Sequence, residues 1–377
     1  MSKNLIRVGA RALIVFLAGA LAATTLPLQA QPGKASTPRA EPLVVGFVYV
    51  TPVGDAGWTY QHDLGRRALE RSLGARVKTL AVESVPEGAD AERVMRDLVG
   101  QGAKLVVATS FGYLEPALRV AADHPEVRFE HAGGYKTAPN LGTYDARYYE
   151  ARWLGGYLAG RISRSGIAGY VAAFPVPEVV QGINAFALGM RAANPRAQVR
   201  VIWLDTWFDP AKERAAAQTL VDRGADVLTN HSASPAVAQA AQANFAERRV
   251  RLVGYTSDMR AFAPDAQAAA IVHQWGGFYT QVATDVLERR WKPAPVWGGI
   301  ASGMVDLTAV DPRLPADVRN DVAARRRAIA GGAFKPFAAP LVDNTGQRRL
   351  MSGTLDDAAI RTMDWLVEGV VGQVPRR

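Results

Sequence analysis

From Leu43 onward the chain repeats one pattern of hydrophobic and polar positions. A short apolar and β-branched run is followed by a turn rich in Gly, Pro, Ser or Asp, and then by a longer segment with helical periodicity. This alternation predicts parallel strands joined by crossover helices. The folded part of the chain is therefore expected to be of the α/β class.

The pattern occurs in two successive series. The first predicts strands at 43–50, 77–82, 105–108 and 127–131, with helices at 60–73, 89–101 and 115–123. The second predicts strands at 167–173, 199–204, 227–229 and 250–254, with helices at 178–193, 210–223 and 235–248. Two such sets favour two doubly wound lobes, with a single barrel as the alternative.

A later strand is predicted at 268–274 and a helix at 278–290, followed by a Gly- and Pro-rich stretch. These segments are consistent with a chain that passes back and forth between the two lobes. The expected first lobe comprises residues 42–145 with about 270–295. The expected second lobe comprises residues 146–269 with about 296–377.

The first thirty residues have the pattern of an export signal. Lys3, Arg7 and Arg11 precede an apolar run at 12–23, and no acidic residue occurs before Glu41. We predict a signal peptide at 1–30 and a disordered lead-in at 31–41. An uncleaved anchor is the alternative, for which the apolar run is short.

Cysteine is absent, which excludes disulfides and lipid attachment through a cysteine. An exported product is thus expected to be periplasmic and not a lipoprotein. The formal charge of +9 falls to +6 without the three signal cations, and the remaining charges are dispersed. Arg325, Arg326 and Arg327 lie in a predicted helix at 318–330 and indicate a solvated face, so no nucleic-acid partner is expected. The five histidines lack metal-ligand spacing, and no cofactor is expected.

Ligands of open parallel sheets bind beyond the carboxyl ends of the strands. After the first strand, a Gly-rich turn carries Asp55 and Trp58, a carboxylate and an indole suited to a flat nitrogen heterocycle. The plainer interpretation is that Asp55 caps a helix and Trp58 packs on the surface. After the third strand, Phe111 and Tyr113 are candidates for the opposite wall, with the alternative that one of them belongs to the core.

The second series continues the aromatic and polar theme after its own strands. These positions are Phe174, Trp207, His231, Tyr255, Thr256 and Asp258. Each could also be ordinary loop chemistry.

A serine hydrolase is the enzymatic alternative. Residues 108–112, Ala-Thr-Ser-Phe-Gly, approach a nucleophile elbow around Ser110, and Asp258 and His273 follow in the hydrolase order. However, Ala replaces the first Gly, and no oxyanion-hole segment precedes the serine. No enzymatic activity is therefore expected.

The order of these motifs resembles the basic membrane protein family of ABC-importer substrate-binding proteins. The similarity extends from about Leu43 to Val371. It includes the segments 54–58 (Gly-Asp-Ala-Gly-Trp), 207–213, 224–227, 254–258, 334–337 and 365–370. The resemblance implies a type I periplasmic binding protein fold, with two α/β lobes joined by a hinge around a ligand cleft. It also implies a purine ligand, recognised by Asp55, Trp58 and either Phe111 or Tyr113.

Two positions depart from the nucleoside-binding members of this family. Thr256 stands where the resemblance places a ribose-binding aspartate, with Asp258 two residues on. His273 stands where the resemblance places a lysine and is followed by Gln274 and Trp275, so His273 and Trp275 are also candidate ligand contacts. We therefore expect a free base such as adenine, with purine nucleosides next. The implied partners are an ABC permease and ATPase complex in the inner membrane, and the receptor is expected to be a monomer. A sensor that signals to a membrane receptor is the alternative.

Overall fold

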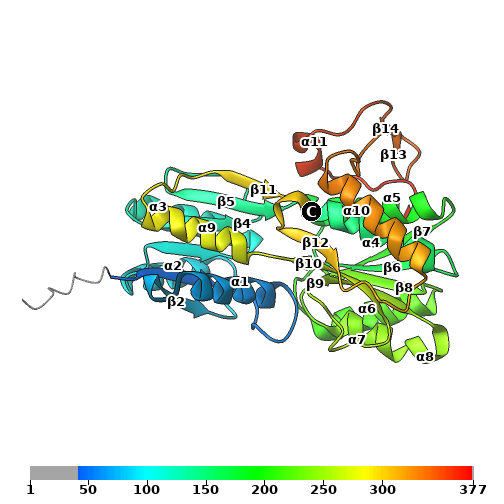
Figure 1. Ribbon diagram of the computed structural model, residues 1–377, viewed down its shortest axis with the longest axis horizontal. Helices are drawn as coiled ribbons and strands as arrows, with labels where there is room; N and C mark the ends of the chain where they lie inside the picture. Colours follow the sequence, from blue (N-terminus) through cyan, green and yellow to red (C-terminus); the bar gives the residue numbers. More distant parts are fainter. Residues whose placement is uncertain (1–40, 376–377) are drawn as a thin grey trace, which may run out of the picture. The chain divides into compact units, whose positions relative to one another are not determined.

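The computed structural model describes residues 41–375, so the expected signal peptide and most of the lead-in lie outside the described residues. Between Glu41 and Pro375 no helix is both long and apolar enough to cross a membrane. Two parallel sheets dominate this part of the chain, and each carries helices on both faces (Figure 1).

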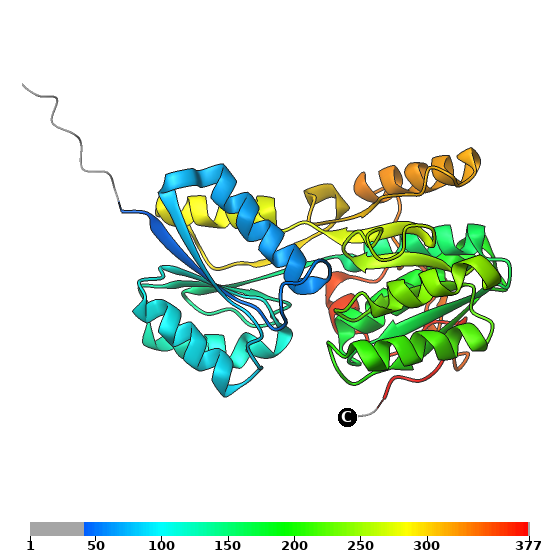
Figure 2. The ribbon, with the colours of Figure 1, turned by 90° about the horizontal axis from the view of Figure 1, so that it is seen from below.

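The first lobe is built on a sheet with the strand order β2-β1-β3-β4-β5-β11, in which every pair is parallel. Its strands are β1 (Leu43–Val48), β2 (Val77–Val82), β3 (Leu105–Ala108), β4 (Arg128–Ala132), β5 (Leu141–Ala146) and β11 (Pro295–Gly298). Its helices are α1 (Trp58–Leu73), α2 (Ala89–Gly100), α3 (Leu114–Asp123) and α9 (Gly276–Leu287), with 3-10 turns η1 (Gly74–Arg76) and η2 (Phe111–Tyr113). Helices α1 and α9 cover one face, and α2 and α3 the other (Figure 2).

The second lobe repeats this order as β7-β6-β8-β9-β10, extended by β12 and β15 at its two edges. Its strands are β6 (Ile167–Ala172), β7 (Gln198–Trp203), β8 (Val227–His231), β9 (Arg251–Thr256), β10 (Gln267–His273), β12 (Val305–Thr308) and β15 (Val370–Val371). Its helices are α4 (Tyr148–Ile162), α5 (Pro177–Ala193), α6 (Pro210–Asp222), α7 (Ala236–Ala243), α8 (Phe245–Arg248) and α10 (Ala316–Ala330), with the 3-10 turn η3 (Ile300–Ser302). Only β12 runs antiparallel to its neighbour in this sheet. The fold is thus the expected type I periplasmic binding protein fold, and the barrel is excluded.

Local sequence explains why these elements form where they do. In α2 the buried residues Ala91, Val94, Met95 and Leu98 follow helical spacing and face the sheet. At the start of α6, Asp209 accepts hydrogen bonds from the two backbone N–H groups of residues 211 and 212. All four residues of β3 are buried, as a central parallel strand requires.

The chain passes between the lobes after β5, after β10 and after β11. Strand β10 lies in the second sheet and β11 in the first, so both later crossings fall a few residues beyond the boundaries expected from sequence. The C-terminal segment adds a short hairpin, β13 (Leu341–Val342) with β14 (Arg348–Leu350), and the helix α11 (Asp357–Arg361). An ion pair between Arg147 and Asp357 ties α11 to the first crossing.

Candidate ligand-binding site

A cavity lies where the carboxyl ends of the two sheets meet, with an empty volume of about 560 Å³ that includes its open mouth. The first lobe lines it with Val50, Thr51, Trp58, Ser110, Phe111, Ala132 and Gly133. The second lobe lines it with Glu178, Trp207, His231, Ser232, Ala233, Tyr255 and Thr256. Both groups of residues lie at the ends of strands or in the turns and first helical residues that come after them, as expected at the carboxyl edge of a parallel sheet.

Trp58 presents its indole to the cavity from the first turn of α1. The indole Nε1 donates a hydrogen bond to the carbonyl of Thr109, at 2.6 Å. Behind the ring lie His62, His273 and Trp275, with centroid distances of 4.6, 5.6 and 6.3 Å. The orientation of this indole is therefore fixed by its surroundings and needs little reorganisation on ligand binding.

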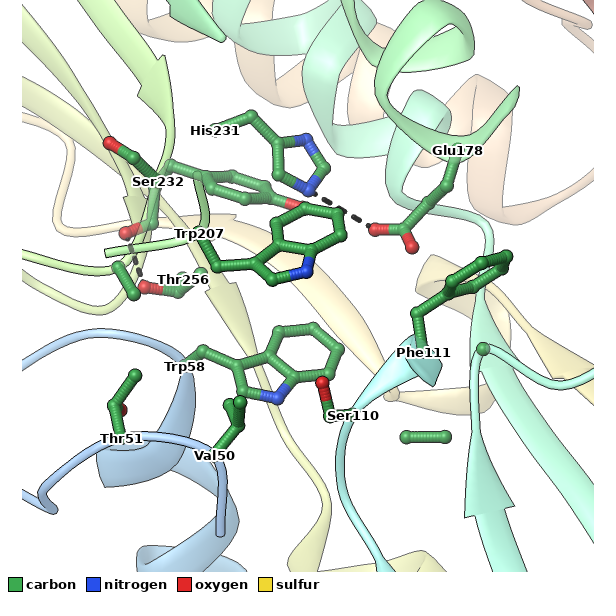
Figure 3. A pocket seen from close by; sticks show the side chains of 14 residues that line it. Val50, Thr51, Trp58, Ser110, Phe111, Glu178, Trp207, His231, Ser232 and Thr256 are labelled. Atoms are coloured by element: carbon green, nitrogen blue, oxygen red, sulfur yellow. Dashed lines mark hydrogen bonds and ion pairs between the residues drawn. The ribbon is translucent and has the colours of Figure 1, made fainter. Parts of the chain in front are cut away.

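Trp207 enters the cavity from the second lobe, after β7, and Figure 3 shows its indole facing the same space as that of Trp58. The ring of Phe174 packs edge-on against it, with centroids 4.9 Å apart. The backbone carbonyl of Trp207 accepts a hydrogen bond from Ala233 N–H at 3.0 Å. One rigid indole from each lobe makes the cavity suited to a flat aromatic ligand.

The polar end of the cavity is formed by Glu178 and His231. His231 Nε2 lies 3.3 Å from Glu178 Oε1, which has no hydrogen-bond partner among the described residues. The Glu178 side chain is 18% exposed, and burial raises its pKa to about 7 against the opposing effect of Arg152. Burial also lowers the pKa of His231 well below its usual value, so a neutral imidazole faces this carboxyl.

A strained residue shapes the wall made by β9. Thr256 has φ +64°, which is rare for a β-branched residue. Its conformation ends the strand so that Tyr255 and Thr256 line the cavity while Ser257 turns to the first lobe. Strain of this kind persists where surrounding contacts enforce it and is concentrated at functional sites.

The two lobes are hydrogen-bonded to one another at the turn before α1. Gly57 N–H donates to Ser257 Oγ at 2.9 Å, and Gln61 Nε2 donates to the same oxygen at 3.1 Å. Gly57 has φ +99°, and a Cβ atom there would overlap the carbonyl oxygen of Ala233. Glycine is therefore required for this close approach.

The turn that brings Gly57 to the second lobe leaves Asp55 exposed, outside the cavity lining. This placement differs from the expected base-recognising role. The physical reason is the local geometry, since Gly54 adopts φ +57° and Ala56 packs into the apolar cluster of α6 and α7. Asp55 does not cap α1 either, because that helix has no side-chain cap.

Phe111 and Tyr113 separate on the η2 turn. Phe111 lines the cavity near its mouth, beside Tyr135, with ring centroids 6.2 Å apart. Tyr113 is fully buried in the first-lobe core, and its hydroxyl donates to the carbonyl of Val85. The stacking role expected for Tyr113 is thus not supported, because one tight turn directs the two side chains to opposite sides.

His273 and Trp275 were expected at the ligand but lie in the layer behind the lining residues. His273 is fully buried against Tyr148 and Tyr255, with centroids 4.4 and 5.0 Å away. Trp275 stacks on His62 at 5.1 Å with an interplanar angle of 3°. These rings support Trp58 and Tyr255 from behind, and Phe174 supports Trp207 in the same way.

The hydrolase alternative requires contacts that the structure does not contain. Ser110 donates to Glu87 at 2.6 Å, and Asp258 pairs with Arg260 outside the cavity. Both ring nitrogens of His273 lack hydrogen-bond partners in the described chain. Ser110, Asp258 and His273 therefore do not form a triad, which needs the base bonded to both partners. Within residues 41–375 no cluster of acidic and imidazole groups is suited to a metal ion.

Glu178 is the cavity residue that sequence reasoning missed as a ligand contact. It lies in the first turn of α5, directly after β6, so it corresponds in the second lobe to Trp58 after β1. The strand pattern predicts this equivalence, but a carboxylate at the start of a helix also has an ordinary structural explanation. Ser232 was likewise visible in the turn after β8 and also lines the cavity.

Two doubly wound lobes with a cavity between them at the carboxyl ends of their sheets are the architecture of the type I periplasmic binding protein fold. A family profile described as ABC transporter substrate-binding protein PnrA-like, Bmp, matches residues 43–331. The chain therefore belongs to this family of ABC transporter substrate-binding proteins.

Individual relatives differ in the ligands their descriptions give. A purine-binding protein of Brucella abortus is 44% identical over 89% of this chain and 95% of its own length. A Haloferax volcanii protein, provisionally described as an ABC transporter glucose-binding protein, is 35% identical over 89% and 82%. A solved solute-binding protein of Aeropyrum pernix shares the fold, with a TM-score of 0.68 and 18% identity over 79% of this chain and 94% of that one.

Proposed function

We propose that this chain captures a purine, with the free base adenine preferred to a nucleoside, for an ABC importer. The observation that carries the proposal is the pair of indoles, Trp58 and Trp207, which line one cavity from opposite lobes. A purine placed between them would gain stacking on both faces, while Glu178 and His231 would meet its N–H and ring-nitrogen edge. The name of the Brucella relative supports the same ligand class.

Preference for the free base is supported by the groups near β9. Thr256 lines the cavity, and the nearby carboxylate of Asp258 is held by Arg260 Nε and by Gln267 Nε2. No carboxylate from this loop therefore reaches the lining to hold a ribose. A buried hydroxyl without a partner is costly, so a nucleoside would bind less tightly.

Isothermal titration of protein freed of bound ligand tests this proposal. We expect adenine to bind at least about tenfold more tightly than adenosine, which is about 1.4 kcal/mol. Glucose serves as the second arm, since the Haloferax relative carries that description. Tighter binding of adenosine would overturn the base preference. Binding of glucose without any purine would overturn the ligand class.

We further propose that the ligand acts by hinge closure and that the closed receptor docks on a periplasmic face of the permease, as a monomer. A ligand that contacts both lobes stabilises the arrangement in which both contacts exist. The hydrogen bonds from Gly57 and Gln61 to Ser257 would form in that arrangement.

Replacing Gly57 by Ala should weaken adenine binding by about tenfold or more, because the added Cβ meets the Ala233 carbonyl and opposes closure. Gly54→Ala is the matched control: Gly54 also has positive φ, but no atom lies within 4 Å of its would-be Cβ. Titration calorimetry measures affinity, and small-angle scattering measures compaction on adding adenine. Wild-type affinity in Gly57→Ala would contradict the closure mechanism.

A further inference from the structure

Arg152 is a buried cation directly behind the ligand cavity. It lies on α4 and is fully buried, and its guanidinium carbon is 3.3 Å from the centroid of the Tyr255 ring. Tyr255 in turn lines the cavity. A desolvated guanidinium on an aromatic face is a favourable contact that fixes the plane of the ring. Arg152 therefore determines where one cavity wall stands without lining the cavity itself.

The same guanidinium holds the end of β8. Nη2 donates to the carbonyl of Asn230 at 2.9 Å, and Nη1 donates to Thr229 Oγ1 at 3.2 Å. The next residue is His231, which faces Glu178. Arg152 thus fixes two cavity residues, Tyr255 through its ring and His231 through the preceding carbonyl.

The charge of Arg152 is not neutralised by an ion pair within the described chain, and its Nε has no hydrogen-bond partner. A buried cation without a counter-ion is costly, so an anion nearby is favoured. Glu178 is the cavity carboxyl on which the charge of Arg152 acts. Burial raises the pKa of Glu178 to about 7, and the positive charge of Arg152 opposes that rise. The other titratable groups around Glu178 are Asp145, Tyr148, Tyr170, His231 and Tyr255.

We propose that Arg152 is a positioning residue of the ligand site, which sets Tyr255 and His231 in place and keeps Glu178 as an acceptor for a ligand N–H group. This inference rests on the proposed purine ligand and specifies which edge of it is recognised: an N–H donor edge directed at Glu178. Capture then depends on pH, since the carboxylate accepts a stronger, charge-assisted hydrogen bond, whereas the protonated carboxyl is a weaker acceptor and carries an O–H donor of its own.

The test is adenine titration between about pH 5.5 and 8.5 for wild type, Glu178→Gln, Arg152→Met and Arg152→Lys. Wild-type affinity should fall below about pH 7, approaching tenfold per pH unit, as expected for one linked proton. Glu178→Gln should bind more weakly at high pH and show a flat profile. Arg152→Met should move the midpoint upward by about one pH unit, and Arg152→Lys, which keeps the charge, should leave the midpoint near that of wild type.

Two controls separate this effect from loss of structure. Arg161→Met removes a cation from the same helix, where Arg161 pairs with Asp317 at the surface, and should leave the profile unchanged. Glu115→Gln removes an exposed carboxyl from the first turn of α3 and should also have no effect. Circular dichroism checks the folding of each variant.

A ligand-free measurement distinguishes failure of this inference from failure of the purine proposal. The carboxyl ¹³C resonance of Glu178, assigned by its loss in Glu178→Gln, should titrate at higher pH in Arg152→Met than in wild type. An unchanged midpoint, or affinity that improves below pH 7, would overturn the role of Arg152 and the N–H donor edge. If the midpoint shifts as expected but no purine binds, only the ligand assignment is overturned.

Discussion

Replacing Trp207 by Ala, or Trp58 by Ala, should weaken adenine binding by about 10- to 100-fold each. Stacking of a base on an aromatic side chain is worth about 1–3 kcal/mol by alanine substitution, and each indole covers one face of the cavity. The double variant should lose more than either single variant, because the two lobes grip opposite faces of one ring. Calorimetry at a fixed pH measures all four proteins.

Phe208→Ala is the matched control for the indole variants. Phe208 is the next residue after Trp207, is 41% exposed and does not line the cavity, so its removal should leave affinity unchanged. Thermal unfolding checks Trp58→Ala separately, because Trp58 also bonds Thr109 and packs on buried rings. Full affinity in both single variants would mean that the ligand does not lie between the indoles, and the site proposal would be wrong.

Much of the fold followed from hydrophobic patterning because parallel strands buried on both faces give short apolar runs. The expected strands at 77–82 and 105–108 agree with β2 and β3 to the residue. Helix α6 begins at Pro210, where Asp209 caps it, in agreement with the helix expected from residue 210. Because both sheets are open and parallel, the candidate site was expected at the carboxyl ends of their strands, and the cavity lies there.

Helix α4 escaped sequence reasoning for a physical reason. Residues around its whole circumference are buried, so it lacks the polar face that marks an amphipathic helix. Gly156 of α4 lies against the backbone of Phe186 in α5, so close that a Cβ atom would overlap the Phe186 carbonyl oxygen. Such close helix contacts depend on tertiary packing, which periodicity along one segment does not record. Strand β5, just before α4, was missed with it.

Within the site, sequence located the turns better than the individual side chains. The turn after β1 was expected to contribute both Asp55 and Trp58, yet Trp58 lines the cavity and Asp55 is exposed. The choice between them depends on positive φ angles at glycines on either side of Asp55, which no pattern of hydrophobicity encodes. Sequence did not identify Glu178 because a carboxylate in a first helical turn already has an ordinary explanation, namely its favourable interaction with the helix dipole.

Replacing His131 by Asn should make the stability of the protein less sensitive to acid. His131 lies on β4 and is fully buried. Burial lowers its pKa to about 3 in the folded protein, whereas the unfolded chain takes up the proton near the usual value of 6.5. Its contribution to stability is therefore complete above about pH 6.5 and is lost as pH falls toward 3.

Between pH 6.5 and 5 this single group should account for up to about 2 kcal/mol of unfolding free energy, at about 1.36 kcal/mol per pH unit. Buried carboxyls act in the opposite sense: burial raises the pKa of Glu130 to about 8, so acidification favours its folded, protonated form. The informative quantity is thus the difference in slope between wild type and His131→Asn, measured by urea unfolding at both pH values. His124→Asn is the control, because the His124 side chain is 30% exposed, and it should leave the slope unchanged. Equal slopes for wild type and His131→Asn would show that the imidazole of His131 gains a proton in the folded state as readily as in the unfolded chain.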